Sequence, residues 1–503
     1  SMVPKDQSEL VLSGSEKANI KEEKIVAGAE KEFKMKYGKE KAEFKKTPTI
    51  YDRSEPPLGE PPLLEVPTVW RGDLANGVKL YGIENNELPM VQFTMRIDGG
   101  QSLDPQGKEG VASILGTMLK EGTKNRTPAE LEEAIDLLGS SISTSVGLEG
   151  MYITGNTLAK NFKETISLLT EMLTEPRWDV QAFDIVKNRR MNSIKQRKTN
   201  AQSVAFSALA KQLYGSNHPA STPLGGTEKT VNSITMKDIK NYFESNVSPK
   251  VSHFHIAGDI KQTTAQRLLG HLSQSWRGEK IDIPKIASVQ TPTKPKVFFI
   301  DIPDAKQSAI SVGTLTIPGD DPELFKLTVV NNRLGGGMEA RLMRTLRLEK
   351  GYTYGAGSFL RPNSFQTPFY AYSQVRSNVT LESLEIFKNI INSYSESYNN
   401  EDLETTKNKL IKSNALRFER LGSMLNMLDT MSKFNLDDTY IQNEQEVLTS
   451  MRLDEAKRLA EARLDGKKMY YVIAGDAKTQ LNRISKLGYG KPIMLDRDGN
   501  TIK

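Results

Sequence analysis

The chain contains two copies of one pattern, and this internal repeat constrains its fold more than any other feature. The segment HIAGDI recurs as VIAGDA, and their aspartates, Asp259 and Asp476, are 476 − 259 = 217 residues apart. With the same offset, QFTMRI from Gln92 falls on AISVGT from Ala309. An offset shared by separate strand-like segments indicates two domains with a common fold.

A third segment pair agrees, because YITGN at Tyr152 falls near YAYSQ at Tyr370. Each is followed by a run with helical periodicity, FKETISLLTEML or LESLEIFKNIINSY. The sequence therefore predicts a charged arm and proline-rich linker at residues 1–68, a first domain at 69–280, a linker at 281–296 and a second domain at 297–503.

Local patterns predict an α+β fold, in which each domain is an antiparallel β-sheet covered by α-helices. NGVKLYGI begins with an Asn-Gly turn and continues as a strand, and SSISTSV followed by MYITGN indicates a hairpin. Between them lies TPAELEEAIDLLG, where Thr127 is the expected N-cap, Pro128 the first helical residue and Gly139 the residue beyond the end.

Composition excludes several classes of function. The chain has no cysteine, so disulfides, thiol catalysis and thiolate metal sites are absent. A net charge of +6 over 503 residues, without a basic and aromatic stripe, argues against nucleic acid as a partner. No apolar run is long enough for a membrane span. The lack of cysteine weakly favours a periplasmic or cell-envelope location, but the compartment stays unknown from the sequence.

The start of the chain is rich in lysine and glutamate at residues 15–46, which predicts a charged helical arm. The alternative is a solvated helix without a function of its own. No apolar segment near the start resembles a signal peptide. Ser1 precedes Met2, which suggests that the natural start and any targeting signal are missing.

The stretch LGGGMEARLMRTLRLEKGYTYGAGSF is the most distinctive single segment. Its glycines, Gly335, Gly336 and Gly337, match neither a Walker loop nor a dinucleotide fingerprint, so we interpret them as a flexible entry to a helix. Met338, Leu342 and Leu346 then form a stripe that we expect to be buried.

We expect this helix to stop at Gly351. YTYGAGSF then predicts a strand on which Tyr352 and Tyr354 share a face.

The four histidines do not form an obvious metal site. His253 and His255 are two apart on a predicted strand and share a face, which would suit a metal ion if a third ligand converged. No residue is nominated by the sequence as that ligand, so we favour an ordinary polar strand face. His218 and His271 are expected in a loop and on a helix surface.

Residues 69 to 500 resemble the pitrilysin/insulinase-type zinc metallopeptidases, which include mitochondrial processing peptidase. The resemblance is carried in the first copy by DGGQSLDPQGKEGVASILGTMLKEGTKNRTPAELEE. In that family the helix in this segment bears an inverted zinc motif, His-x-x-Glu-His. The resemblance implies a half-clamshell of two homologous domains that encloses a peptide with another half.

The zinc motif itself is degenerate. Ser113, Gly116 and Thr117 stand where the family has His, Glu and His, and Asn192 and Ser193 stand at the expected position of its third ligand, a Glu. None of these residues offers the imidazole, carboxylate or thiolate that zinc prefers. We therefore expect no metal and no cofactor in this chain, and zinc in the partner half.

The second copy retains a different family feature. In the family an arginine and, seven positions later, a tyrosine reach the zinc site of the other half, and here Arg347 and Tyr354 match, since 354 − 347 = 7. Such donors can stabilise the oxyanion of a tetrahedral intermediate. The resemblance also implies substrate binding by Gly335, Gly336 and Gly337, although Glu339 and Ala340 replace a common serine.

The expected function is therefore that of the non-zinc-binding half of a zinc metalloendopeptidase. Its partner would be a homologous zinc-bearing half, either a separate chain or a missing N-terminal portion, and its substrates would be peptides. Alone, the chain should be inactive. The alternatives are a purely structural subunit, like core proteins of respiratory complexes, and an independent enzyme, for which no nucleophile and base are visible.

Overall fold

The computed structural model describes residues 50–52, 64–414 and 416–502. The charged arm and much of the proline-rich linker that the sequence predicts lie outside the described residues. The chain divides into two units, residues 1–59 and 60–503, and the account below concerns the second unit.

The first copy forms a six-stranded sheet with the order β1-β2-β6-β3-β5-β4. Its strands are β1 (Trp70–Asp73), β2 (Lys79–Glu84), β3 (Met90–Asp98), β4 (Ser141–Val146), β5 (Gly150–Leu158) and β6 (Ser252–Gly258). The predicted Asn-Gly turn joins β1 to β2, and the predicted hairpin is the antiparallel pair of β4 and β5.

The second copy repeats this sheet with the order β12-β7-β11-β8-β10-β9. Its strands are β7 (Lys296–Asp301), β8 (Gln307–Leu315), β9 (Thr353–Leu360), β10 (Pro368–Arg376), β11 (Tyr470–Gly475) and β12 (Ile493–Leu495). The predicted fold of two sheets covered by helices is confirmed. The sheets are mixed, however, because β2 pairs parallel to β6, and β7 pairs parallel to both β11 and β12.

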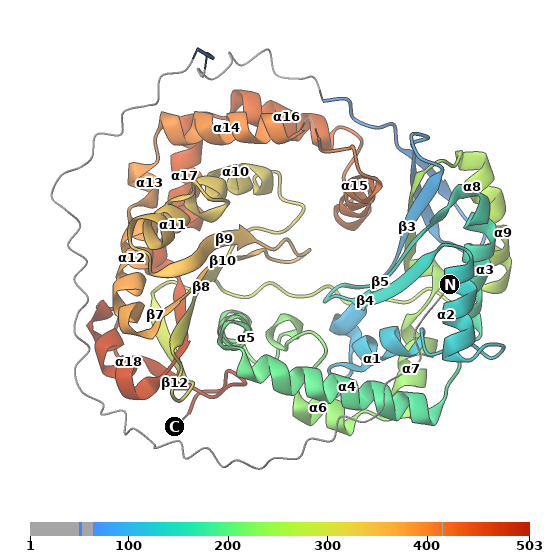
Figure 1. The fold of residues 1–503 in the computed structure, drawn as a ribbon, viewed down its shortest axis with the longest axis horizontal. Helices are drawn as coiled ribbons and strands as arrows, with labels where there is room; N and C mark the ends of the chain where they lie inside the picture. The colour runs from blue at the N-terminus through green and yellow to red at the C-terminus, as the bar shows by residue number, and fades with distance from the viewer. Residues whose placement is uncertain (1–49, 53–63, 415, 503) are drawn as a thin grey trace, which may run out of the picture. The chain divides into compact units, whose positions relative to one another are not determined.

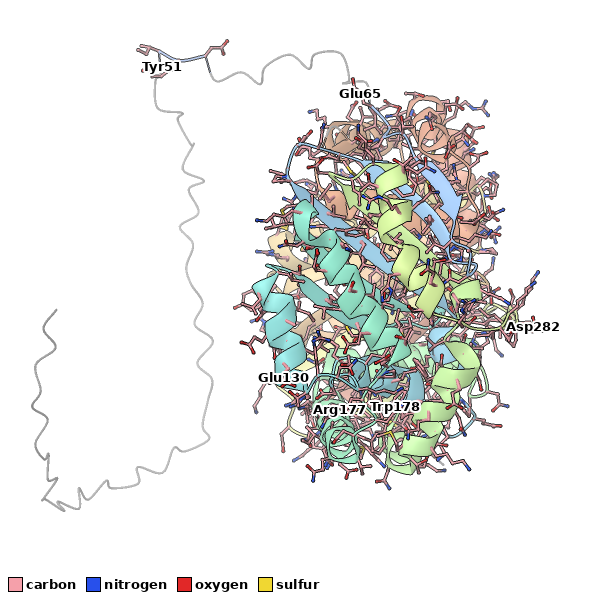
Figure 2. The ribbon with its side chains drawn as sticks, turned by 90° about the vertical axis from the view of Figure 1, so that its right-hand side faces the viewer. Tyr51, Glu65, Glu130, Arg177, Trp178 and Asp282 are labelled. Carbon is pink, nitrogen blue, oxygen red and sulfur yellow. The ribbon has the colours of Figure 1, made fainter. Side chains whose placement is uncertain are left out.

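Helices cover one face of the first sheet, where the odd-numbered residues of β3 are buried. These helices are α1 (Val111–Met118), α2 (Pro128–Leu137), α3 (Phe162–Thr174), α7 (Met236–Asn246), α8 (Gln262–Leu268) and α9 (Gly270–Ser275). The N-cap predicted for α2 is confirmed, since Thr127 and Glu130 form a capping box. Figure 2 labels Glu130 in a view from this side of the molecule.

The second sheet has an equivalent helical layer, which buries Val297 and Phe299 of β7. Its main helices are α10 (Leu324–Gly335), α12 (Thr380–Asn392), α17 (Leu453–Arg463) and α18 (Ala477–Ile484). The α7 and α17 helices differ by the repeat offset, because 453 − 236 = 217. The repeat therefore extends to the helices as well as to the strands.

The other face of each sheet is covered by a helix from the opposite copy (Figure 1). The α5 helix (Ala201–Tyr214) packs on β8 and β11, and α15 (Leu421–Phe434) packs on β3 and β6. Both have 14 residues, and they start 421 − 201 = 220 positions apart, so they are equivalent elements. The two copies thus exchange equivalent helices.

The remaining helices connect these layers. They are α4 (Val180–Thr199), α6 (Glu228–Ser233), α11 (Arg341–Met343), the π-helix η5 (Arg344–Glu349), α13 (Tyr394–Ser397), α14 (Asn400–Asn414) and α16 (Tyr440–Ser450). Within the described ranges, no helix combines the length and apolar character that crossing a membrane requires.

Candidate functional site

The residues that the resemblance places at the zinc motif lie on α1, which is held by hydrogen bonds between side chains and its backbone. Asp104 accepts hydrogen bonds from the N–H groups of Gly110 (2.6 Å) and Ala112 (2.8 Å) at the start of the helix. The Gly116 carbonyl accepts from Thr144 Oγ1 at 2.6 Å. A Cβ at Gly116 would approach the Val146 side chain to 3.0 Å, which is tighter than normal packing.

The residues at the expected ligand positions do not fit a zinc ion. Thr117 Oγ1 donates back to the Ser113 carbonyl at 3.3 Å, while Asn192 and Ser193 are exposed on α4. Hydroxyl and amide groups are poor zinc ligands. Among the residues that the structure describes, no three histidine or acidic side chains are arranged to hold a metal.

A buried polar cluster lies where α15 covers the first sheet. Arg96 donates to Asp98 of its own strand and to Asp429 of α15, both at 2.7 Å. His253 Nε2 contacts Asp98 Oδ2 at 3.1 Å. His255 Nε2 contacts Ser432 Oγ of α15 at 2.7 Å. The two histidines share a polar strand face; His255 bonds to α15, whereas His253 bonds to Asp98 of the neighbouring strand β3.

The electrostatics of this cluster favour a neutral His255. Burial, together with the positive charge of Arg96, lowers the pKa of the His255 imidazole well below its ordinary range. Burial opposes ionisation of Asp98, but hydrogen bonding to His253 and the charge of Arg96 hold its pKa below the ordinary value. The cluster therefore contains one buried cation matched by acidic groups.

The other two histidines lie outside this cluster. His218 stacks on Tyr214 with ring centroids 4.7 Å apart, and its Nε2 lies 3.0 Å from the Ala287 carbonyl. His271 is exposed on α9. His218 thus helps to fix the segment that joins the two copies.

The glycine run differs from our expectation of an entry to a helix. Gly335 is the last residue of α10 and Gly336 its C-cap, and the next helix begins only at Arg341. A Cβ at Gly335 would lie 2.1 Å from the Ser358 backbone nitrogen, so only glycine allows α10 to approach β9 this closely. Gly337 lies beyond the helix end and is half-buried.

The apolar stripe after the glycines is only partly buried. Leu342 and Leu346 are inaccessible to solvent as expected, whereas the Met338 side chain is 50% exposed. The expected burial of Met338 is wrong because the helix starts three residues after it. A residue outside the helix does not follow the helical period.

Three arginines follow at intervals of three, and only one lacks a carboxylate partner in the described part of the chain. Arg341 pairs with Asp402 at 2.5 Å, and Arg344 pairs with Glu349 at 3.1 Å. For Arg347 the structure records a polar contact with the Met338 sulfur at 3.8 Å. Its guanidinium is exposed, so its donors are accessible to a ligand.

The turn from this helix into β9 has two irregular features. The helix ends in a π-helical turn, η5, and Gly351 adopts φ +62° directly after it, as expected of a helix stop. The β9–β10 register then shifts between Ser373 and Val375, which produces a β-bulge at Tyr354. Bulges re-aim the side chains that they carry.

Tyr352 and Tyr354 consequently have different surroundings. Tyr352 packs against the core of the second copy, whereas Tyr354 is 89% exposed. Within the described residues, the Tyr354 hydroxyl has no hydrogen-bond partner. Arg347 and Tyr354 therefore lie on consecutive elements, η5 and β9, and both present accessible donors.

A cavity that sequence reasoning missed lies between α5 and the second sheet and is also lined by the turn between β4 and β5; its volume is about 560 Å³. Its wall includes Phe206 of α5, Phe359 of β9 and Tyr370 of β10. The only signal in the sequence is the aromatic residues of β9 and β10. The sequence does not show that α5 packs on this sheet, so these aromatic residues would be interpreted as ordinary strand packing.

Comparison with known proteins identifies two matching family models. Residues 82–228 match "Insulinase (Peptidase family M16)", and residues 233–410 match "Peptidase M16 inactive domain". The fold is similar to the peptidase M16 inactive domain from Pseudomonas fluorescens, with a TM-score of 0.74 and 23% identity, covering 81% of this chain and 98% of that one.

Two further similarities come from Helicobacter pylori. The chain is 24% identical over 400 residues to the non-peptidase homolog YmxG, covering 78% of this chain and 91% of that protein. It also resembles the crystal structure of a protease, with a TM-score of 0.75 and 15% identity, covering 82% of this chain and 100% of that one. A Bacillus subtilis relative, 22% identical over 284 residues, is described as an uncharacterized zinc protease; the match covers 56% of this chain and 68% of that protein.

Proposed function

This chain belongs to the insulinase family of peptidases, family M16, and from that premise we propose that it is the non-zinc-binding half of a metalloendopeptidase. It would close on a homologous zinc-bearing half around a peptide. Its own contribution would be to bind the peptide and to donate hydrogen bonds from Arg347 and Tyr354.

The observation that carries this proposal is the pair of accessible donors on η5 and β9. Arg341 and Arg344 are both engaged by carboxylates, while Arg347 is not. Tyr354 is 89% exposed, whereas Tyr394 and Tyr398 of the same copy are fully buried. Exposing a tyrosine and an unpaired arginine on adjacent elements brings no evident gain in stability, which supports a role in binding.

The chemistry of the pair suits acyl transfer to water. A phenol and a guanidinium are strong hydrogen-bond donors, and both can stabilise the negative charge that develops on a scissile carbonyl oxygen. The donor set on α1 and α4 does not fit zinc, so no step of hydrolysis is assigned to those residues. The metal of the partner half would supply polarisation of the carbonyl and activation of water.

The test is a reconstitution assay. The chain is mixed with a zinc-bearing M16 homologue, and cleavage of a quenched fluorescent peptide is followed. We expect Tyr354→Phe and Arg347→Ala each to lower kcat by about 10²-fold, the usual effect of removing one oxyanion donor. Either chain alone should show no turnover.

Matched controls separate a catalytic effect from a local structural one. Arg344→Ala removes an exposed arginine of the same π-helix that is paired with Glu349, and Tyr352→Phe alters the neighbouring tyrosine. Both controls should retain turnover. Unchanged turnover in Tyr354→Phe and Arg347→Ala would refute the donor role and favour a purely structural subunit, which the lack of a zinc donor set also permits.

A further inference from the structure

We propose that the cavity between α5 and the second sheet binds an aromatic side chain of the peptide together with a neighbouring acidic residue. This inference rests on the proposed function, because it names the class of peptide that this half would hold. The cavity has a volume of about 560 Å³, within the usual range for ligand pockets.

Part of the cavity wall is an aromatic cluster drawn from both copies. Phe206 of α5 meets Tyr370 edge-to-face, with centroids 5.5 Å apart and planes at 89°. Phe359 of β9 lies 5.2 Å from Tyr370 and is 37% exposed. An additional ring can join such a cluster through the same edge-to-face contacts.

The charges around the cavity favour an acidic neighbour to that ring. Its lining contains Arg197, Arg361 and Lys433 but one acidic residue, Glu149. Glu149 already pairs with Lys433 at 2.9 Å. In the described residues neither Arg197 nor Arg361 forms an ion pair with a carboxylate, so both can attract an acidic side chain.

The surroundings of those two arginines support this assignment. Arg197 donates to the carbonyls of Leu224 at 3.1 Å and Gly226 at 2.7 Å, so its hydrogen-bond partners in the described residues are neutral, and Asp498 attracts it without forming an ion pair. Arg361 is exposed and lines the cavity together with Phe359 and Tyr370. A carboxylate entering beside a bound ring would therefore meet a cation.

The position of the cavity relative to Tyr354 sets a distance along the peptide. Phe359 and Tyr354 lie on the same edge strand, five residues apart. The register shift places Tyr354 and Gly355 together opposite Gln374, while Phe359 lies opposite Tyr370, so the stretch spans 374 − 370 = 4 positions on β10. At a rise of about 3.3 Å per residue this is about 13 Å, so the aromatic residue of an extended bound peptide would lie about four positions from the peptide bond at Tyr354.

The binding test uses the full chain without a partner, so it does not depend on catalysis. A fluorescein-labelled peptide rich in Gly and Ser, with one Phe flanked by two Glu, is titrated and followed by fluorescence anisotropy. We expect Phe359→Ala to weaken binding by about tenfold or more. Arg361→Gln should weaken it about three- to tenfold, with the difference from wild type shrinking at high salt.

The controls lie in the same sheet. Ile493 lies on the opposite edge strand, and its exposed fraction of 36% is similar to the 37% of Phe359. Arg376 is an exposed arginine at the end of β10. Ile493→Ala and Arg376→Gln should bind as wild type. Peptides with Phe replaced by Ser, or Glu by Lys, should bind about tenfold more weakly.

Wild-type affinity in both Phe359→Ala and Arg361→Gln would overturn the inference. So would a change in sedimentation coefficient on either substitution, because that would assign the cavity to a second copy of the chain. If the cavity substitutions leave peptide binding unchanged but Tyr354→Phe still lowers kcat as expected, the proposed function stands and only the cavity inference is refuted. Normal binding with unaffected turnover would refute the donor role alone.

Discussion

His255 is inaccessible to solvent and lies between the first sheet and α15, so its protonation is linked to stability. Its pKa is depressed in the folded chain, mainly by burial and then by Arg96. The unfolded chain, with an ordinary pKa of about 6.5, therefore binds more protons below that pH. Stability must fall as pH drops through this region.

Replacing His255 by Gln should remove this pH dependence. Between about pH 7.5 and about pH 5.5, the wild-type free energy of unfolding should fall about 1.4 kcal/mol more than that of His255→Gln. Urea denaturation at the two pH values measures the free energy of unfolding of the wild type and of His255→Gln. His271→Gln, an exposed histidine on α9, should keep the wild-type dependence. Equal pH dependence in wild type and His255→Gln would contradict the assignment of a neutral buried imidazole.

At the scale of elements, the two exchanged helices are held differently. The α5 helix contacts the second sheet mainly through apolar side chains such as Val204 and Leu209. The α15 helix adds a buried ion pair between Arg96 and Asp429. Arg96 is 2% exposed, so removing it would leave Asp98 and Asp429 as uncompensated charges.

We therefore expect Arg96→Met to lower the free energy of unfolding by about 3–5 kcal/mol. The matched control is Arg71→Met, because Arg71 pairs at 2.6 Å with Asp438, just beyond α15, with side-chain exposures of 40% and 63%. That exposed pair should contribute less than about 1 kcal/mol. Equal effects of the two substitutions in urea denaturation would argue against a special role for the buried cluster.

The sequence predicts many of these elements because they carry either a local signal or a repeated one. The offset of 217 locates β3 and β8, and the Thr127 capping box locates the start of α2. The interpretation of the glycine run as the entry to a helix is wrong, because Gly335 is required by the close approach of β9 and not by the helix after it. The exchange of α5 and α15 could not be predicted, because amphipathic periodicity marks a buried face without saying which sheet it buries against.

In the candidate site, too, some features can be predicted from the sequence and others depend on the tertiary structure. The spacing of Arg347 and Tyr354 can be read from the sequence, as can the residue types at Ser113, Gly116 and Thr117, which are poor zinc ligands. The register shift at Tyr354 cannot, since it depends on how β9 pairs with β10. The cavity is also invisible in the sequence, because it joins Phe206 to Phe359 and Tyr370 across the two copies.

At the scale of the whole molecule, the exchanged helices predict that both copies unfold together. Gly335→Ala would force a Cβ to within 2.1 Å of the Ser358 nitrogen in the second copy, an overpacking that costs about 1–3 kcal/mol. All three tryptophans, Trp70, Trp178 and Trp276, lie in the first copy. Their fluorescence midpoint in urea should nevertheless fall together with the midpoint from far-UV circular dichroism.

The control for this experiment is Gly337→Ala, where a Cβ would meet the flexible end of Lys409 at 3.0 Å. That substitution should leave both midpoints near wild type. A tryptophan midpoint that stays unchanged in Gly335→Ala, while the circular dichroism separates into two transitions, would show that the copies unfold independently.

The exchange of α5 and α15 also bears on ancestry. Neither copy covers both faces of its own sheet, so a chain of half this length would leave one sheet face exposed to water. Two such chains could satisfy each other by swapping the same helix across a two-fold axis. The present molecule has the organisation that gene duplication and fusion of a symmetric, domain-swapped homodimer would produce.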